Sequence, residues 1–339
     1  MTQPLLYLIV FFLLTGAVVT LVYLKNKGLI GKNRKSLEKT RIEDILKQLY
    51  HVEKSGRKAN ISELSNALRI RMVKMLPLVE HMSVRGLIQI DGSEIKLTEG
   101  GLDYALKIVR VHRLYEKYLS ERTGFDKVEW HDRAERMEHQ FTVGETEELA
   151  RTLGFPRFDP HGDPIPTAQG EVIEINSLAL SSVSAGFIGK IVHIEDEPEV
   201  IYRQIIAKDL HVGSQIKILE SADNLLRFYS EGKEYELTPI VAANINVVAL
   251  SEQEIFEENS ERLSKLRKGE SAKVIGISKE CRGPARRRLL DLGFIPGTEI
   301  IAEMVSPMEN PKAYLLRNTL IALRDDQAEY VLVEKLTHG

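Results

Sequence analysis

The pattern of apolar and polar positions divides the chain into an uncharged first segment, a helical first half and a β-rich second half. Residues 5–24 carry no charge over about the length that spans the hydrocarbon core of a bilayer. Residues 36–55 repeat apolar positions at helical spacing, and two further helical stretches follow up to about Val84. The apolar runs 87–90 and 94–97 flank a Gly-containing turn and predict a hairpin. Three helices followed by a hairpin indicate a winged helix-turn-helix.

The helical half continues to Leu153, and a β-rich half follows it. A long helix is expected to about Thr123, and shorter helices are expected up to Leu153. Four prolines and two glycines in the following stretch predict a linker. Beyond it, residues 189–216 and 272–300 repeat one pattern, in which an apolar strand leads through a helical connector to a Gly-containing turn and a second strand. The chain is therefore expected to have an α+β fold that ends in two small β-barrels in tandem.

Charge decides how the uncharged segment is interpreted. Basic residues follow it at once, whereas the residues before it carry no charge. The positive-inside rule therefore predicts a single-pass helix in the cytoplasmic membrane, with the bulk of the chain in the cytoplasm. A cleaved signal peptide is the alternative, but it needs a basic first region and a small-residue cleavage site that are not evident. The single cysteine, Cys281, excludes an intrachain disulfide and suits a reducing compartment.

Candidate chemistry gathers in the helical region after residue 98. The helix that begins at Trp130 carries two imidazoles and two carboxylates on one face, and the helix before it adds a His/Glu pair one turn apart. This nitrogen and oxygen donor set suits Mn²⁺ or Fe²⁺, and Zn²⁺ is a further option. A solvated charged face is the alternative interpretation of these glutamates. The candidate ligands are His112, Glu116, His131, Glu135, Glu138 and His139.

Several motifs carry a resemblance to known families. The helices and hairpin, with LTEGG, VHRLYEKYL, VEWHDRAERMEH and PHGDPIP, resemble the diphtheria toxin repressor family of metal-dependent transcriptional regulators over about residues 37–167. The motifs LRKGESAKVIGIS and RRRLLDLGFIPGTEI resemble FeoA, a small SH3-like protein of ferrous-iron uptake, and residues 180–250 look like a diverged copy. The predicted domains are a membrane anchor with its basic flank (1–35), a winged helix-turn-helix (36–97), a helical metal-binding and dimerisation domain (98–155), a linker (156–170) and two SH3-like domains (171–250 and 262–337).

The resemblance implies two metal positions. The principal one would use Asp44 together with Glu135, Glu138 and His139, and the second would use His112, Glu116 and His131. Manganese-type members carry a further Glu one turn after the aspartate, where this chain has Lys47. In the implied mechanism, a bound metal ion connects the first helix to the dimerisation helices and sets the spacing of the two DNA-binding domains in the dimer.

The DNA-reading helix is expected between Arg69 and Met82. Only Arg69, Arg71 and Lys74 suit DNA there, and phosphate contact is favoured over base readout. Pro77 falls in the middle of this stretch, where a proline kinks a helix or costs about 3 kcal/mol.

We therefore expect a membrane-tethered, metal-dependent regulator that forms a homodimer, binds operator DNA and controls metal uptake. The alternative is a metal-sensing adaptor that regulates a ferrous-iron or manganese transporter through its FeoA-like domains without specific DNA binding. No nucleophile–base pair or phosphate loop indicates an enzyme. His161 is expected to be a turn residue, Cys281 a packed thiol, and Trp130 a neighbour of the metal-binding helix.

Overall fold

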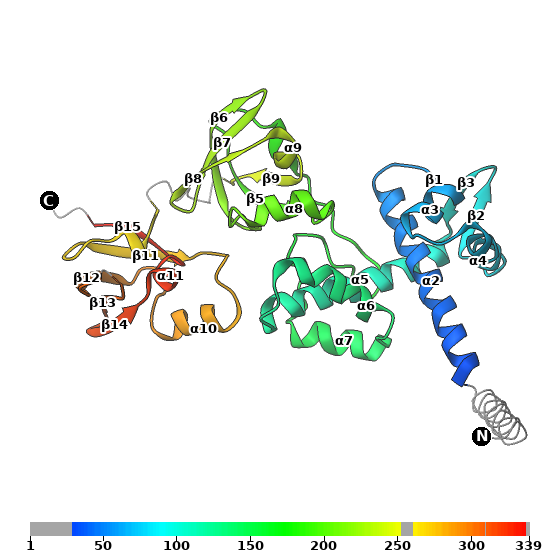
Figure 1. The fold of residues 1–339 in the computed structure, drawn as a ribbon, viewed down its shortest axis with the longest axis horizontal. Helices are drawn as coiled ribbons and strands as arrows, with labels where there is room; N and C mark the ends of the chain where they lie inside the picture. Colours follow the sequence, from blue (N-terminus) through cyan, green and yellow to red (C-terminus); the bar gives the residue numbers. More distant parts are fainter. Residues whose placement is uncertain (1–28, 252–259, 309, 337–339) are drawn as a thin grey trace, which may run out of the picture. The chain divides into compact units, whose positions relative to one another are not determined.

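The computed structural model describes residues 29–251, 260–308 and 310–336, drawn in colour in Figure 1. It divides into two compact units, residues 1–110 and 111–339, and the division falls within the long helix α5 (Glu99–Arg122).

The first unit has the predicted order of helices and hairpin. The helix α2 buries Ile45, Leu46 and Leu49 completely, and these side chains recur at the spacing of one helix face. It contacts α4 and β3, so its apolar face lies against the rest of the unit. The strands form a sheet of order β1-β3-β2, and all its pairs are antiparallel. The elements are α2 (Leu29–Lys54), β1 (Ala59–Asn60), α3 (Ile61–Ala67), α4 (Met72–Val84), β2 (Ile88–Asp91) and β3 (Glu94–Leu97).

The helix α4 passes through its proline. The sequence suggested that Pro77 kinks this helix or costs about 3 kcal/mol, and α4 nevertheless runs from Met72 to Val84 with Pro77 inside it. Pro77 is exposed, so the carbonyl group that loses its N–H donor lies where water can replace the donor. The opposite face holds the helix in place through four buried apolar side chains, Met75, Leu78, Val79 and Met82.

The second unit begins with a helical layer. After α5 come a short 3₁₀ helix η1 (Lys127–Glu129), α6 (Trp130–Glu138) and α7 (Val143–Thr152). A capping box fixes the start of α7, because Thr142 Oγ1 accepts a hydrogen bond from Glu145 N (3.3 Å) and Glu145 Oε2 accepts one from Thr142 N (2.8 Å).

The Pro/Gly-rich stretch after α7 is packed, contrary to its interpretation as a linker. The guanidinium group of Arg113, on α5, donates to the carbonyl oxygen of Pro164 (2.6 Å) and to Asp163 Oδ1 (2.9 Å). Asp159 and His161 are each only 4% exposed. These contacts keep the stretch against α5, where it can contribute side chains to a site.

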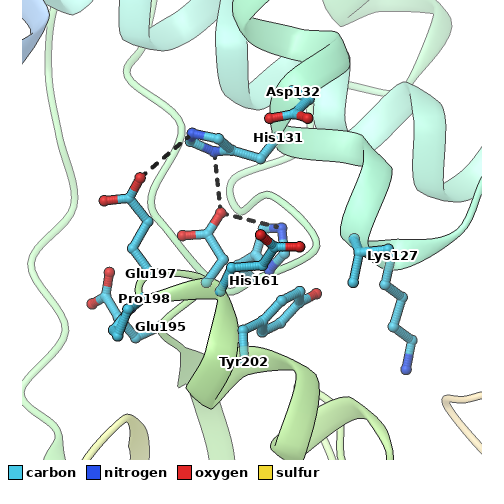
Figure 2. A pocket seen from close by; sticks show the side chains of 11 residues that line it. Lys127, His131, Asp132, His161, Glu195, Glu197, Pro198 and Tyr202 are labelled. Carbon is cyan, nitrogen blue, oxygen red and sulfur yellow. Dashed lines mark ion pairs between the residues drawn. The ribbon is translucent and has the colours of Figure 1, made fainter. Parts of the chain in front are cut away.

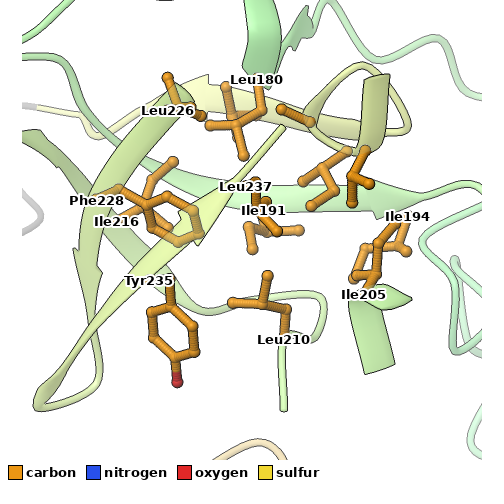
Figure 3. Packing of buried hydrophobic residues seen from close by; sticks show 14 of the residues in the cluster. Leu180, Ile191, Ile194, Ile205, Leu210, Ile216, Leu226, Phe228, Tyr235 and Leu237 are labelled. Atoms are coloured by element: carbon orange, nitrogen blue, oxygen red, sulfur yellow. The ribbon is translucent and has the colours of Figure 1, made fainter. Parts of the chain in front are cut away.

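Two six-stranded antiparallel sheets complete the second unit. The first has the order β4-β9-β5-β6-β7-β8 and surrounds a core of aliphatic and aromatic side chains that Figure 3 shows from close by. Its elements are β4 (Leu178–Ala179), η2 (Leu180–Ser182), β5 (Ile188–Ile194), α8 (Glu199–Ile206), β6 (Gln215–Ala222), β7 (Leu225–Ser230), β8 (Lys233–Leu237), α9 (Pro239–Ala242) and β9 (Ile245–Ala249).

The second sheet has the order β10-β15-β11-β12-β13-β14, which is the same connectivity. Its elements are β10 (Glu261–Arg262), η3 (Leu263–Lys265), β11 (Ser271–Ile277), α10 (Gly283–Asp291), β12 (Glu299–Val305), β13 (Lys312–Leu316), β14 (Thr319–Leu323), α11 (Asp325–Ala328) and β15 (Val331–Lys335).

Irregularities in strand pairing recur at matching places in the two sheets. The register of β5 shifts between Ile191 and His193, and the register of β11 shifts between Val274 and Gly276. Corresponding shifts occur where β6 pairs with β7 and where β12 pairs with β13. Because a bulge bends a strand at one fixed position, the shared positions indicate that both copies curve in the same way. We call the two sheets with their connectors the first barrel (178–249) and the second barrel (261–335).

The expected membrane helix requires a correction. Among the residues that the structure describes, no helix combines the length and apolar character needed to cross a membrane. The long helices α2 and α5 carry charged side chains along their whole length, which makes them unsuited to hydrocarbon. Segment 5–24, on which the prediction rested, lies outside the described residues. The transmembrane part of the predicted fold class, and the predicted membrane location, are therefore wrong for the described chain.

Candidate metal centre

The second unit brings together the ligands predicted for the second metal position. His112 and Glu116 lie one turn apart on α5, and His131 lies in the first turn of α6. Glu116 Oε1 is 3.1 Å from His112 Nε2 and 3.5 Å from His131 Nδ1. One donor atom from each residue can be chosen so that the three lie within 4.8 Å of one another. His112 and Glu116 are buried, and His131 is half-buried.

The end of α6 extends this cluster. Glu138 Oε2 lies 2.5 Å from His112 Nδ1, and Glu138 Oε1 lies 3.7 Å from His139 Nε2. The helix ends at Glu138, and His139 is its C-cap residue. Glu135 is exposed, and its carboxylate lies 3.6 Å from His131 Nε2.

A second group shares Glu116 with the first. Glu116, His161 and Asp196 also offer donor atoms that lie within 4.8 Å of one another. Asp196 follows β5, and its Oδ2 is 3.2 Å from His131 Nδ1 and 3.9 Å from His161 Nε2. His161 Nε2 is buried and has no hydrogen-bond partner among the described residues. A buried nitrogen of this kind is expected to have a partner, which makes it a candidate ligand atom.

The excess of carboxylates shapes the electrostatics of these groups. Burial raises the pKa of Glu116, but the charge and hydrogen bond of His112 and the hydrogen bond of His131 outweigh burial and hold the pKa well below its usual range. Burial lowers the pKa of His131, but hydrogen bonds to Asp196, Glu116 and Glu135 outweigh burial and raise it to about 12. The cluster therefore favours positive charge at its centre, which is the condition that a cation would also satisfy.

A cavity of about 670 Å³ opens beside this cluster (Figure 2). In Figure 2 the ring of His131 lies above His161, and the dashed lines include the ion pairs that these two rings make with Asp196. The acidic run after β5 also lines the cavity, and Glu197 Oε1 is 3.9 Å from His131 Nε2. The cavity is thus bordered by carboxylates on one side and imidazoles on another.

The remaining predicted residues lie in the first unit. Asp44 is half-buried on α2, and its part in a metal site remains a prediction. Arg69, Arg71 and Lys74 are all exposed, but only Lys74 is on α4 itself. Arg71 is the N-cap residue, and Arg69 precedes it with a positive φ of 52°.

Sequence reasoning missed His161 and Asp196. His161 was interpreted as a turn residue because prolines and glycines surround it, and the acidic run that contains Asp196 was not considered. Two features of the sequence could have indicated these residues. His161 lies in a stretch that also holds the apolar Ile165, which suggests that the stretch packs, and the carboxylates near Asp196 come directly after a predicted strand. Only packing reveals that the two segments meet at Glu116.

Two family models match the chain. The model described as iron dependent repressor, metal binding and dimerisation domain, matches residues 98–167. The FeoA domain model matches residues 261–335. The first match contains both histidines and the glutamate of the first cluster, and the second match contains the second barrel.

Two individual relatives are similar to parts of the chain. The diphtheria toxin repressor of Corynebacterium diphtheriae is 25% identical over 226 residues, which are 61% of this chain and 96% of that protein. A probable metal transport system membrane protein of Chlamydia trachomatis is 42% identical over 82 residues, which are 24% of this chain and only 18% of that protein.

A solved structure extends the comparison to the fold. A manganese-dependent transcriptional repressor in complex with manganese superposes with a TM-score of 0.57 at 27% identity, and the match covers 61% of this chain and 99% of that one. This relative and the diphtheria toxin repressor are repressors, which agrees with the expectation of a non-enzyme. The chain therefore contains a metal-binding and dimerisation domain of the iron-dependent repressor type at residues 98–167 and a FeoA domain at residues 261–335, and over 61% of its length it is similar to the diphtheria toxin repressor.

Proposed function

We propose that this protein is a metal-dependent transcriptional regulator that binds Mn²⁺ or Fe²⁺, forms a homodimer and binds operator DNA to control metal uptake. The observation that carries the proposal is the buried carboxylate of Glu116, which lies among three imidazoles and a second carboxylate contributed by four separate segments. Buried charges of this kind are retained where they are paired or bind metal.

The donor set fits a divalent transition metal. His112, Glu116 and His131 would hold one ion, and His161 and Asp196 would add donors on the other side of Glu116. Imidazole nitrogens with carboxylate oxygens suit Mn²⁺, Fe²⁺ and Zn²⁺ better than softer ions. Glu138, at 2.5 Å from His112 Nδ1, would orient that ring so that its Nε2 faces Glu116.

The protein residues decide what metal binding changes. When bound, the cation would supply positive charge that neutralises the converging carboxylates. His112 and Glu116 belong to α5, His131 to α6 and Asp196 to the first barrel, so shared ligation fixes these three segments against one another. We expect the family's dimerisation region, residues 98–167, to be ordered by this event.

DNA binding would begin at the exposed basic residues around the start of α4. Arg69, Arg71 and Lys74 suit phosphate oxygens, whereas the exposed apolar side chains between them, Met72 and Val73, offer no hydrogen bond to a base edge. We therefore expect a strong dependence of affinity on salt concentration. The adaptor hypothesis and a transporter partner receive no support from the matched repressors.

The test is a selection of fragments of the organism's own genomic DNA with the full-length protein, with and without Mn²⁺ or Fe²⁺. We expect metal-dependent enrichment of a palindromic site, as a two-fold symmetric dimer requires. Lys74→Gln should weaken binding to that site, while Lys107→Gln, which removes an exposed lysine on α5, is the matched control. Metal binding without enrichment of any sequence would contradict the proposed DNA binding.

A further inference from the structure

A loop of the second barrel lies against the start of the metal-binding helix. Residues 278–283 connect β11 to α10, and Glu280 Oε2 is 2.7 Å from Lys127 Nζ in η1, directly before α6. The guanidinium carbon of Arg282 lies 4.6 Å from the centre of the Trp130 ring, which is the distance of a cation–π contact.

These contacts continue as a column of rings toward the candidate ligands. The ring centres of Trp130 and His161 are 5.9 Å apart, and those of His161 and Tyr202 are 5.3 Å apart. All three side chains are at most 5% exposed. The column thus joins Arg282 of the second barrel, Trp130 of α6, His161 of the packed loop and Tyr202 of the first barrel. His161 belongs to the candidate metal cluster, and Trp130 directly precedes His131.

The loop is also anchored on its other side. Ser278 Oγ donates to Glu231 Oε2 (2.7 Å), and Arg262 Nη2 donates to the same oxygen (3.2 Å), so both barrels meet at Glu231. Lys127 and Glu280 keep only 13% and 23% of their side chains exposed. Because a largely desolvated pair is less screened than a surface pair, its geometry is held more firmly.

We propose that Glu280 and Arg282 are positioning residues for the metal centre, so that docking of the second barrel is coupled to binding of a divalent cation. Arg282 fixes Trp130, and Trp130 in turn limits how the His161 ring and the first turn of α6 can move. This inference rests on the proposed function, because it requires that the cluster binds metal. Coupling is reciprocal, so a bound cation should also tighten the contact of residues 278–283 with α6.

The experiment measures both directions of this coupling in the full-length protein with Mn²⁺ as the probe. Equilibrium dialysis gives the affinity, and Trp130, the single tryptophan of the chain, reports the column by its fluorescence. We expect Arg282→Ala and Glu280→Gln to weaken Mn²⁺ binding about fivefold or more at unchanged stoichiometry. Arg282→Lys, which keeps the charge but loses the planar group, should restore part of the affinity. The control Arg287→Ala removes an exposed arginine from α10 and should bind Mn²⁺ as the wild type does.

Hydrogen exchange then separates positioning from a merely structural role. In the wild type, Mn²⁺ should slow exchange of the amides in residues 278–283, and this protection should be lost in Arg282→Ala. The coupling would be overturned, with the proposed function left standing, by either of two results. One is that Arg282→Ala and Glu280→Gln both bind Mn²⁺ with wild-type affinity, and the other is that Mn²⁺ does not change the exchange rate of residues 278–283. A wild-type protein that binds no divalent cation would overturn the proposed function and the coupling with it.

Discussion

Glu116 occupies the position on which both candidate donor groups depend. It is 2% exposed, and it belongs to the group with His112 and His131 and to the group with His161 and Asp196. A carboxylate has two oxygens and can therefore serve both groups. No other described residue belongs to both of these groups, which makes Glu116 the most informative residue to change.

Glu116→Gln should weaken Mn²⁺ binding by at least about 100-fold, or about 2.8 kcal/mol, because an amide keeps the shape of the ligand but loses its charge. Equilibrium dialysis measures the change. Glu121→Gln, farther along α5 and paired with Lys117 at 3.2 Å, is the matched control and should bind as the wild type does. Equal affinities for the two variants would show that the metal site is elsewhere.

His161→Ala tests the candidate ligand that sequence reasoning missed. Loss of one imidazole donor should weaken Mn²⁺ binding by about tenfold or more. His161 Nε2 is buried without a hydrogen-bond partner among the described residues, so packing alone does not explain why a histidine stands there. Isothermal titration calorimetry gives the affinity and the number of ions bound. The control is His51→Ala, an exposed histidine on α2. An unchanged Mn²⁺ affinity and stoichiometry would show that His161 is a packed loop residue and not a ligand.

At the scale of the element, α4 shows how tertiary packing overrides a local signal. Its buried side chains recur at helical spacing on one face, and Pro77 lies on the exposed face. Burial of an apolar side chain contributes about 1.5–3 kcal/mol, so four of them exceed the cost of one interior proline. The helix therefore forms in spite of the residue that predicts its end.

Pro77→Ala should raise the stability of the first unit by about 1–3 kcal/mol, since alanine restores one N–H donor and removes a steric conflict. Pro239→Ala is the matched control. Pro239 is the first residue of α9, where a missing N–H costs nothing, so its replacement should change stability by less than about 1 kcal/mol. Urea denaturation followed by far-ultraviolet circular dichroism checks both variants. Equal midpoints would show that α4 has already relaxed around the missing hydrogen bond.

At the scale of the second unit, a buried charge network joins the two barrels. Glu231 accepts hydrogen bonds from Ser214 Oγ (3.0 Å), Ser278 Oγ (2.7 Å) and Arg262 Nη2 (3.2 Å), and its Oε1 is 3.0 Å from His211 Nε2. Burial raises the pKa of Glu231, but the hydrogen bond and charge of His211, with help from Ser278 and Arg262, outweigh burial and lower the pKa from 4.5 to about 2.

This depressed pKa predicts how acid separates the barrels. A carboxyl with a lower pKa in the folded state stabilises fully above its unfolded pKa, and this stabilisation is lost as the pH falls toward 2. The shift corresponds to about 3 kcal/mol. Glu231→Gln should therefore be less stable than the wild type at pH 7, and the difference in urea midpoint should shrink between about pH 5 and pH 2. The exposed Glu234→Gln is the control, and a difference that stays constant with pH would contradict the prediction.

The sequence determined the elements and their repeats because periodicity and turn residues act locally. The helices of the first half and the hairpin follow from spacing, and the two copies of the barrel follow from matching strand–connector–strand patterns. The pairing of His112 with Glu116 was also predicted, because residues one helical turn apart share a face, and metal binding by the face of α6 stays a prediction. The division of these ligands between two metal positions came from the family resemblance and stays a prediction.

Only the tertiary structure decided which distant segments meet. His161 lies 45 residues after Glu116 and Asp196 follows 35 residues later, so no helical or strand period relates them. Their convergence depends on Arg113 holding the proline-rich stretch against α5 and on the first barrel packing beside α6. The same holds for Arg282 above Trp130. Secondary structure depends on residues that are neighbours in the sequence, whereas a site built from four segments forms only when the buried surfaces of those segments pack together.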